Sequence, residues 1–570
     1  MITQPAAPPW TAHPRRNDER AAELARALGA PLPAAQVLVN RGIGSLEAAR
    51  SYLDPSGEDL HDPFRMRDMD RAVERVERAI KAGERIMVHG DYDVDGITAT
   101  FVLYSALLQL GARAEYRIPH RTRDGYGLTP DAMDDAQRRG CTLVVTVDCG
   151  ITALEAVERG RALGIDTVIT DHHEPPATLP AAVAVVDPLR PGCEYPFKAL
   201  AGVGVAYKLA EALLRERGAV ERAHEYLDAV ALGTIADVVP LVGENRVLAR
   251  LGLDQLNRGG RLGLQALIEV AKLGGKNITS GQVAFVLAPR INAAGRMGNA
   301  EQGLRLLLAR DAREAAAIAG SLEEDNKLRR GIDELVLTEA SGLVETELGW
   351  PACSSILLWS DQWHPGVIGI VASRLVERFQ RPTVLVALAG ERGRGSGRSV
   401  PGLDLNQLLG HCSDLLEAHG GHAFAAGLTV RREHLKELRE RLEALVRERL
   451  APGSSAPGLT IDGVLHLGGC DLTLVEWLER MSPHGLDNPE PLFRSGEVAL
   501  ESVSAVGGGK HLRLGVRDAS GPAEAIGFGL GERVRELTAA RRCELAFVPV
   551  RNEWRGETRV QLKVKGVRVP

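Results

Sequence analysis

Short apolar runs alternate with amphipathic stretches from Glu84 onward. Four runs are rich in β-branched residues, as strands are: 85–89, 142–147, 166–170 and 182–186. Apolar positions recur at helical spacing in 98–110 and 153–163. A further helix is predicted before the first strand, over 69–82, because Val73, Val76 and Ile80 share one helical face. Strands that alternate with helices predict a parallel sheet in an α/β domain.

The pattern changes in the second half of the chain. Residues 206–268 are mostly helical, and residues 301–347 form a long charged stretch that could connect two domains. Trp350 and Pro351 interrupt that stretch. A second strand–helix region then follows, with strand-like and helix-like runs at 355–359, 366–379, 383–388 and 432–450. This region predicts a second α/β domain.

The last part of the chain is read as a small β-barrel. Residues 451–457 have linker composition. Five strand-like runs with glycine turns come after it: 498–506, 511–517, 523–528, 543–550 and 558–569. Five short strands in about 110 residues predict a barrel with an OB-fold as the leading candidate. The predicted organisation is an N-terminal segment, a parallel-sheet domain, a connecting helix, a second α/β domain and a barrel, over 1–45, 46–300, 301–349, 350–452 and 457–570.

The composition and net charge exclude several classes of protein. The 570 residues carry a formal net charge of −6, so an anionic partner must be met by a local basic patch. The seven cysteines are isolated from one another, which argues against a structural zinc site or a disulfide framework. We find neither a long apolar run typical of a membrane span nor the apolar core of a secretory signal. We expect a soluble, reduced, cytoplasmic protein without membrane contact.

The most informative segment follows the first predicted strand. The sequence IMVHGDYDVDGIT places His89, Asp91, Asp93 and Asp95 before a glycine that opens a helix. Three carboxylates this close repel one another unless a cation neutralises them, and hard divalent ions take carboxylate oxygens as ligands. Taken alone, the segment is explained about equally well as a polar turn with a helix N-cap.

Three more polar clusters stand at the ends of predicted elements. Asp148 follows one strand, the triplet Asp171, His172 and His173 follows the next, and Asp237 stands where a helix gives way to a loop. A single aspartate at such a position is more often a cap than a ligand. Because the carboxyl ends of parallel strands meet at one edge of a sheet, we expect these clusters to converge.

The converging set has the composition of a two-metal site. Mixed carboxylate and imidazole ligands favour Mn²⁺ over Mg²⁺, which is the alternative, because imidazole is a poor Mg²⁺ ligand. Two-metal sites most often serve phosphoester hydrolysis, since they generate a nucleophile from water and stabilise charge on the phosphorus oxygens. The expected ligands are Asp93, Asp95, Asp148, His172 and Asp237, with His89 as a sixth candidate.

These motifs resemble those of the DHH phosphoesterase superfamily and, within it, the RecJ single-strand exonucleases. The superfamily motifs occur in order as VHGDYDVDG, TVDCG, TDHH and ADVVP, at 88–96, 146–150, 170–173 and 236–240. RecJ-like motifs follow as PRINAAGRMGN, WHPGVIGIVASRL, GRGSGRS, GGHAFAAG and MSPHGLDNPEPLF, at 289–299, 363–375, 393–399, 420–427 and 481–493. The resemblance covers most of the chain from about Val39.

The resemblance implies a DHH domain, a DHHA1 nucleic-acid-binding domain and an OB-fold domain over the three globular regions. It implies that the five principal ligands hold the metal pair and that His173 faces the scissile phosphate, while His89 matches a ligand of pyrophosphatase relatives. It also implies 5′-to-3′ hydrolysis of single-stranded DNA to 5′-mononucleotides, in recombination and mismatch repair. The partners that it implies are single-stranded DNA with a 5′ end, a single-stranded DNA-binding protein and a RecQ-type helicase. We expect a monomer.

Several clusters are candidates for holding the nucleic-acid backbone. GRGSGRS sets arginines among glycines, which would let backbone amides and a guanidinium converge on a phosphate, although a surface turn explains it equally well. GGHAFAAG resembles a glycine-rich nucleic-acid-binding motif. The candidates are Arg121, Arg290, Asn292, Arg296, Ser396, Arg398, Ser399, Gly420, Gly421 and His422.

The end of the chain is locally basic. Residues 539–570 contain eight Lys or Arg against three Glu, which fits a barrel that tracks the phosphates of a single strand. A solvated basic face is the plainer interpretation. Aromatic residues are few in this region, so backbone tracking should outweigh base stacking.

Two alternative functions are open at this point. One is a DHH hydrolase for short oligonucleotides, cyclic dinucleotides or pyrophosphate, which the extra barrel and MSPHGLDNPEPLF argue against. The other is a non-catalytic binding module that has lost its metal ligands, as in a eukaryotic replication relative, which the intact acidic and histidine set argues against.

Overall fold

The computed structural model describes residues 9–569 except 122, 126, 450–457 and 555. Its first sheet has five strands in the order β3-β2-β4-β5-β6, and every neighbouring pair is parallel. The strands are β2 (Arg85–His89), β3 (Arg113–Arg117), β4 (Leu143–Val147), β5 (Asp166–Thr170) and β6 (Ala184–Val186). The predicted parallel sheet is therefore confirmed.

Helices cover both faces of this sheet, which explains why its strands are apolar along their whole length. Helices α4 (Met69–Ala82), α5 (Val94–Gln109) and α8 (Gly202–Glu216) share one apolar core with the sheet. Helices α6 (Pro130–Arg138) and α7 (Leu154–Ala162) form a smaller core on the other face. The predicted boundaries of α4 agree with the structure, since its apolar stripe is unbroken.

A helical layer extends the larger core. It contains α9 (Leu227–Ala236), α10 (Gly243–Asn257), α11 (Leu262–Val270), α12 (Ser280–Gln282), the π-helical turn η4 (Val283–Leu287) and α13 (Ala288–Met297). The predicted connecting helix is two helices, α14 (Glu301–Leu308) and the 35-residue α15 (Ala312–Thr346). The break lies at Asp311, whose side chain caps α15 by accepting hydrogen bonds from Arg313 N and Glu314 N.

The second α/β domain contains a mixed sheet in the order β10-β11-β9-β8-β7. Strands β7 and β8 are parallel, and the other neighbouring pairs are antiparallel. The strands are β7 (Ile356–Ser360), β8 (Thr383–Ala389), β9 (Arg392–Arg398), β10 (Leu416–Gly421) and β11 (Ala425–Arg431). The helices of this domain are α16 (Ile368–Phe379), α17 (Leu405–Gly410) and α18 (Leu435–Arg449).

The C-terminal strands close into a barrel, as predicted. Pairing runs from β18 through β15, β16, β17 and β19 and returns to β18. These strands are β15 (Val498–Val506), β16 (His511–Asp518), β17 (Gly521–Gly527), β18 (Arg542–Trp554) and β19 (Glu557–Arg568). Smaller elements of the domain are β12 (Leu459–Ile461), β13 (Gly463–Val464), β14 (Phe493–Arg494), α19 (Leu472–Arg480) and α20 (Val534–Ala539).

The N-terminal segment packs on this distant barrel. Strand β1 (Trp10–Ala12) pairs in parallel with β12, and helices α1 (Asp18–Leu28), α2 (Leu32–Asn40) and α3 (Leu46–Leu53) share the apolar core of the barrel. The predicted boundary between residues 45 and 46 therefore differs from the structure, because α3 buries Ala49 and Leu53 in the barrel core. No local pattern in the sequence indicates a contact across more than 400 residues.

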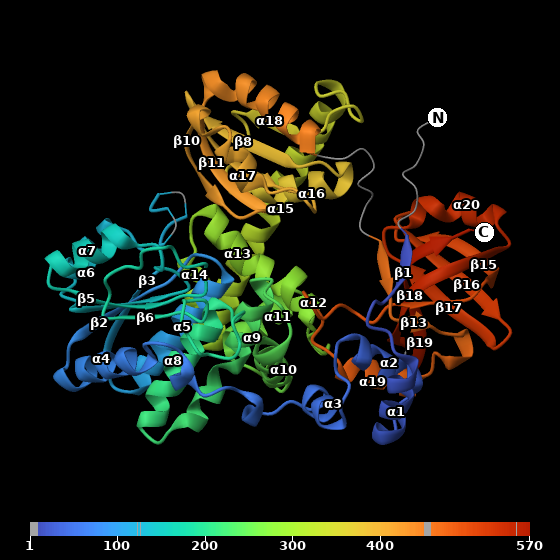
Figure 1. Cartoon of the computed structure of the whole chain (residues 1–570), viewed down its shortest axis with the longest axis horizontal. Coiled ribbons are helices and arrows are strands. Elements are labelled where there is room, and N and C mark those ends of the chain that lie inside the picture. The colour runs from blue at the N-terminus through green and yellow to red at the C-terminus, as the bar shows by residue number, and fades with distance from the viewer. Residues whose placement is uncertain (1–8, 122, 126, 450–457, 555, 570) are drawn as a thin grey trace.

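Figure 1 shows the three bodies, with the second α/β domain above the first and the barrel beside them together with the N-terminal helices. Helix α15 runs between the two α/β domains. All seven cysteines are free thiols. Within the described part of the chain, every helix is too short or too polar to cross a bilayer.

Close helix packing in the first domain generates a stability prediction. Gly252 on α10 faces α9 so closely that a Cβ atom there would lie 2.0 Å from the Leu227 carbonyl oxygen. We expect Gly252→Ala to destabilise the protein by about 1–3 kcal/mol, because backbone must move to make room. Thermal unfolding followed by circular dichroism measures the change.

A second helical glycine provides the control. A Cβ at Gly320 on α15 would meet no atom within 4 Å. Gly320→Ala should raise stability by about 0.5–1 kcal/mol, because alanine loses less entropy than glycine in a helix. Equal melting temperatures for the two variants would contradict the packing described.

Candidate active site

The acidic segment after β2 forms the first turn of α5. Asp93 is the N-cap of this helix, and its Oδ1 accepts hydrogen bonds from Asp95 N at 3.0 Å and Gly96 N at 3.1 Å. Asp95 lies one residue inside the helix and is buried. The helix cap therefore uses one carboxylate oxygen of Asp93.

Asp95 is held by a second helix. Its Oδ2 accepts a hydrogen bond from Gly202 N at 2.7 Å, and its Oδ1 accepts one from Val203 N at 2.8 Å. Both amides belong to the first turn of α8, where the helix dipole favours an anion. A Cβ at Gly202 would lie 2.3 Å from Asp148 Oδ1, so only glycine lets α8 approach this closely.

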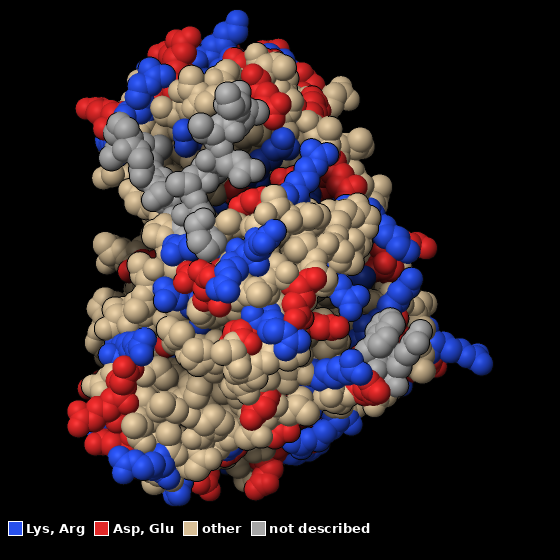
Figure 2. Space-filling model, turned by 90° about the vertical axis from the view of Figure 1, so that its right-hand side faces the viewer, with Lys and Arg blue, Asp and Glu red and all other residues tan. Residues whose placement is uncertain are grey.

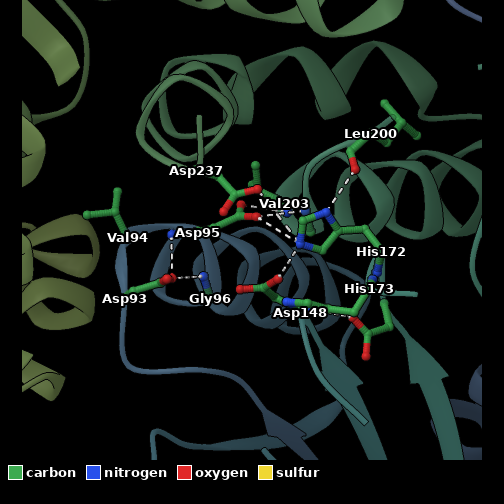
Figure 3. A network of polar contacts seen from close by, with 12 residues as sticks. Asp93, Val94, Asp95, Gly96, Asp148, His172, His173, Leu200, Val203 and Asp237 are labelled. Carbon is green, nitrogen blue, oxygen red and sulfur yellow. Dashed lines mark hydrogen bonds and ion pairs between the residues drawn. The ribbon is translucent and has the colours of Figure 1, made fainter. Parts of the chain in front are cut away.

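His172 joins the carboxylates from the other clusters. Its Nδ1 lies 3.1 Å from the Leu200 carbonyl oxygen, which can only accept, so Nδ1 carries a proton and Nε2 faces the acids. His172 Nε2 lies 3.1 Å from Asp148 Oδ1, 3.9 Å from Asp95 Oδ2 and 3.8 Å from Asp237 Oδ2 (Figure 3). The predicted convergence of four clusters at one sheet edge is therefore observed.

His173 is oriented by the first member of the triplet. Asp171 Oδ1 lies 2.6 Å from His173 Nδ1, and Asp171 Oδ2 accepts a hydrogen bond from Ile151 N at 2.9 Å. Burial opposes the charge of Asp171, but the hydrogen bond and charge of His173, the Ile151 amide and the charge of His172 together outweigh it and lower the pKa of this carboxyl. Asp171 therefore stays ionised and holds the ring of His173, which is half-buried at the edge of the site.

The buried carboxylates of the site repel one another. Burial, reinforced by neighbouring carboxylates, raises the pKa of Asp95 to about 6 and holds the pKa values of Asp148 and Asp237 well above their usual range. Burial lowers the pKa of His172, but the charges of the surrounding aspartates, with those of Asp237 and Asp95 the largest, together outweigh it and raise the pKa. A cation placed among these groups would relieve the repulsion.

Among the described residues, three groupings of side chains could hold a metal ion. They are Asp95 with His172 and Asp237, Asp148 with His172 and His173, and Asp91 with Asp93 and Asp148. In each, ligand atoms lie within 4.8 Å of one another. Two groupings share Asp148 and two share His172. These carboxylate and imidazole donors would fit a pair of hard or borderline divalent cations.

Asp91 is the residue that the sequence-based ligand set left out. It is buried, its Oδ1 has no hydrogen-bond partner among the described residues, and burial and Asp93 hold its pKa well above the usual range. The signal was visible in the crowding of Asp91, Asp93 and Asp95, but the sequence alone does not say which of the three points inward.

His89 is not part of these groupings. Its Nε2 lies 3.3 Å from the Gly127 carbonyl oxygen, and burial lowers its pKa to about 4, so the ring is neutral. The described residues thus bring together the five principal predicted ligands, whereas the assignment of His89 stays a prediction.

Arginines gather beside the acidic site. Burial and the charges of Arg121, Arg329 and Arg398 lower the pKa of Arg296 to about 9. Burial and Arg121 likewise lower the pKa of Arg398. Arg296 Nη1 donates to the Gly366 carbonyl oxygen at 2.9 Å, and Arg398 Nη1 donates to Ser396 Oγ at 3.2 Å. Like charges this close are stabilised by an anion between them.

The two α/β domains supply this cluster jointly. Arg121 and Arg296 come from the first domain and Arg398 and Ser396 from the second. Arg329 on α15 was not predicted, because an arginine in a charged helix carries no distinguishing signal in the sequence.

Three other predicted phosphate ligands already contact groups of the protein. Arg290 Nε pairs with Glu323 Oε2 at 2.7 Å, so its charge is compensated. Asn292 Oδ1 accepts a hydrogen bond from Val94 N at 3.2 Å and so supports α5. Ser399 Oγ is buried and donates to the Leu403 carbonyl oxygen.

The GRGSGRS motif is a strand, which corrects the expectation of a loop whose amides bind phosphate. Strand β9 pairs with β8 on one side and β11 on the other, so the sheet occupies its backbone amides. Cβ atoms at Gly393, Gly395 and Gly397 would meet Val386, Leu428 and Leu405 at 2.4–2.7 Å. The glycines therefore pack on apolar neighbours, and the alternate residues, including Ser396 and Arg398, face the other side.

Gly420, Gly421 and His422 lie at the end of an edge hairpin. Gly420 pairs with Gly427, Gly421 pairs with Ala426, and His422 N donates to the Ala425 carbonyl oxygen at 2.8 Å. The hairpin is exposed. Its role in binding stays a prediction.

The positive charge counted at the end of the chain is largely compensated. Among its described residues, five basic side chains pair with acidic ones: Arg542 with Glu497, Arg551 with Glu479, Arg559 with Glu557, and Lys563 and Lys565 with Glu490. Figure 2 shows basic side chains beside acidic ones across the face of the molecule that carries the barrel. The predicted basic face is thus weaker than its sequence suggests.

Family models match the three bodies in order. The DHH family N-terminal domain matches residues 85–234, the DHHA1 domain matches 352–448, and the RecJ OB domain matches 461–566. The metal groupings fall in the first match except Asp237, which follows it by three residues.

Whole-chain relatives share this organisation. The single-stranded-DNA-specific exonuclease RecJ of Bacillus subtilis is 39% identical over 94% of this chain and 68% of the relative, and that of Escherichia coli is 37% identical over 88% and 90%. The structure of RecJ with Mn²⁺ from Thermus thermophilus covers 99% of this chain and 80% of that chain, with 32% identity and a TM-score of 0.85. The chain belongs to the RecJ family of DHH phosphoesterases.

Proposed function

We propose that this protein is a metal-dependent exonuclease that hydrolyses single-stranded DNA. The observation that carries the proposal is the convergence of His172 with Asp95, Asp148 and Asp237 at the carboxyl edge of a parallel sheet. Relatives named single-stranded-DNA-specific exonucleases, one of them solved with Mn²⁺, support it.

Each side chain has a role in this proposal. Asp93, Asp95, Asp148, His172 and Asp237 hold two divalent ions, Mn²⁺ in preference to Mg²⁺, with Asp91 as a further acidic contact. When bound, the ions supply an activated water and offset charge on the phosphate oxygens. His173, held by Asp171 through Nδ1, directs Nε2 to the scissile phosphate.

The arginine cluster binds the DNA backbone next to the site. Arg121, Arg296 and Arg398, with Ser396, present guanidinium and hydroxyl groups to a phosphate, and this contact offsets the mutual repulsion of the arginines. Because the cluster draws on both α/β domains, a single strand bound there lies between them. Arg290, Asn292, Ser399, Gly420, Gly421 and His422 are weaker candidates for the same path.

The finer features of the function rest on the family resemblance. We infer 5′-to-3′ polarity, 5′-mononucleotide products and a role in recombination and mismatch repair. A single-stranded DNA-binding protein and a RecQ-type helicase are the proposed partners. A monomeric state and a cytoplasmic location are also proposals.

A product assay tests the function directly. The protein is incubated with Mn²⁺ and single-stranded DNA labelled at its 5′ or 3′ end, and the fragments are followed in time. We expect mononucleotides from the 5′ end, and about 100-fold slower release for Asp148→Ala with DNA binding retained, because a metal ligand is lost. Asp70→Ala, an exposed position on α4, is the matched control.

The assay separates the alternatives. Cleavage of a dinucleotide but not of the single strand would support a small-substrate hydrolase. Binding without cleavage in any divalent metal would support a non-catalytic module. Unchanged activity of Asp148→Ala would exclude the metal assignment.

The raised carboxyl pKa values predict that metal binding depends on pH. Metal ions displace protons from ligands, and Asp95 has a pKa of about 6 without metal. Mn²⁺ affinity should therefore fall about tenfold between about pH 7 and pH 5 for each carboxyl that must lose a proton. Calorimetric titration in two buffers of different ionisation enthalpy measures the affinity and the protons released.

The same shift predicts the pH dependence of stability. The folded, metal-free protein holds a proton on Asp95 that the unfolded chain loses near its ordinary pKa of 3.8. Stability without metal should thus fall as the pH rises from about 4 to 6, and Mn²⁺ should restore it. An Mn²⁺ affinity that is the same at both pH values would contradict these shifts.

The arginine cluster makes a prediction for salt dependence. Arg398→Ala should weaken single-stranded DNA binding about tenfold and reduce the slope of log K against log salt by about 0.7, because one phosphate contact is lost. Arg392→Ala is the matched control, since Arg392 lies on the same strand but pairs with Glu417 at 3.0 Å. Fluorescence anisotropy over a salt series measures the affinity and the salt slope of each variant. Equal slopes for the two variants would argue against a phosphate at Arg398.

A further inference from the structure

The MSPHGLDNPEPLF motif has no role in the function described so far. Its first part, residues 481–489, is hereafter the anchor segment. Figure 1 draws it in orange, between the barrel domain and the helices around α12. It lies outside the metal groupings and the arginine cluster, so its role must follow from its contacts.

The anchor segment is rigidly attached on the barrel side. Asn488 is 1% exposed, and its Nδ2 donates to the carbonyl oxygens of Met481 at 3.1 Å and Pro483 at 2.8 Å. Its Oδ1 accepts hydrogen bonds from Tyr52 Oη and Arg41 Nε, both at 3.0 Å. The segment is thus a closed loop fastened to the N-terminal helices, which themselves pack on the barrel.

The other side of the anchor segment forms hydrogen bonds with the first α/β domain. The Leu486 carbonyl oxygen accepts a hydrogen bond from Leu241 N at 2.8 Å, and the His484 carbonyl oxygen accepts one from Ser280 Oγ at 2.7 Å. Leu241 is 3% exposed, and a Cβ at Gly485 would lie 2.6 Å from its Cδ1. The segment therefore binds the chain four residues after Asp237.

The loop between these points is strained. Val238, the residue directly after Asp237, has a φ of +62°, a conformation that a β-branched residue adopts only at a cost. The side chain of Val238 is exposed and does not pack to offset that cost. Strained backbone persists where the surroundings over-determine it.

Contacts at both ends of the 237–241 loop impose the strained conformation. Upstream, Asp237 N donates to the Gly233 carbonyl oxygen at the end of α9. Downstream, Leu241 is held by the apolar core and by Leu486, and Asn245 Nδ2 donates to the Pro240 carbonyl oxygen at 3.1 Å. Of these two sets of contacts, only the downstream set includes a residue of another domain, Leu486.

We propose that the anchor segment is a positioning element of the metal centre. By holding Leu241, it keeps the 237–241 loop in the strained shape that turns Asp237 toward Asp95 and His172. The barrel domain thereby contributes to metal binding without supplying a ligand. This inference rests on the proposed function, because it takes Asp237 as a metal ligand.

The test is Mn²⁺ binding by calorimetry on the full chain. Gly485→Val forces Leu241 away, and we expect about tenfold weaker Mn²⁺ binding with unchanged single-stranded DNA binding in the absence of metal. Gly496→Val is the matched control in the same domain, because a Cβ there would meet no atom within 4 Å. Circular dichroism checks folding, and Gly485→Ala replaces the valine variant if that one does not fold.

A second substitution separates positioning from general damage. Glycine adopts a φ of +62° without strain, so Val238→Gly should return the Mn²⁺ affinity of the Gly485→Val protein to within about threefold of the original. Equal Mn²⁺ affinity for Gly485→Val and the unaltered chain would overturn the proposal, as would a loss that Val238→Gly does not restore. Failure of the unaltered chain to bind Mn²⁺ would instead overturn the proposed function.

Discussion

Mutual repulsion among buried carboxylates is the constraint on which this structure depends. Asp93, Asp95, Asp148 and Asp237 are brought to one edge of a parallel sheet, where burial raises the pKa of Asp95 to about 6. Such a cluster is tolerable only if rigid elements hold it and cations neutralise it. The sheet, the first turn of α8 and the end of α9 supply the rigidity.

The arginine cluster beside the carboxylates is also assembled from separate elements of the fold. Arg296 and Arg398 come from different α/β domains, and burial together with the charge of Arg121 lowers the pKa of both. An acidic centre beside a basic one suits a phosphodiester backbone, whose scissile phosphate needs metal and whose neighbouring phosphate needs guanidinium groups.

The three bodies are less independent than their order along the chain suggests. The N-terminal helices complete the core of the C-terminal barrel, and the anchor segment of the barrel domain holds Leu241. The barrel is thus fastened to the domain that carries the metal ligands. Its own basic residues are mostly paired with glutamates, so its structural attachment matters beside any direct contact with DNA.

The sequence by itself determined the parallel sheet and its acidic edge, because strand periodicity is local and the carboxylates that follow β2, β4 and β5 must lie at the same edge. It also indicated the barrel through evenly spaced strands. Only the tertiary structure decided that GRGSGRS is a strand with packed glycines, that Asp91 points inward, that residues 10–53 dock on the barrel and that residues 481–489 hold the Asp237 loop. These features depend on contacts between residues far apart in the chain, and local patterns carry no record of which distant surfaces meet.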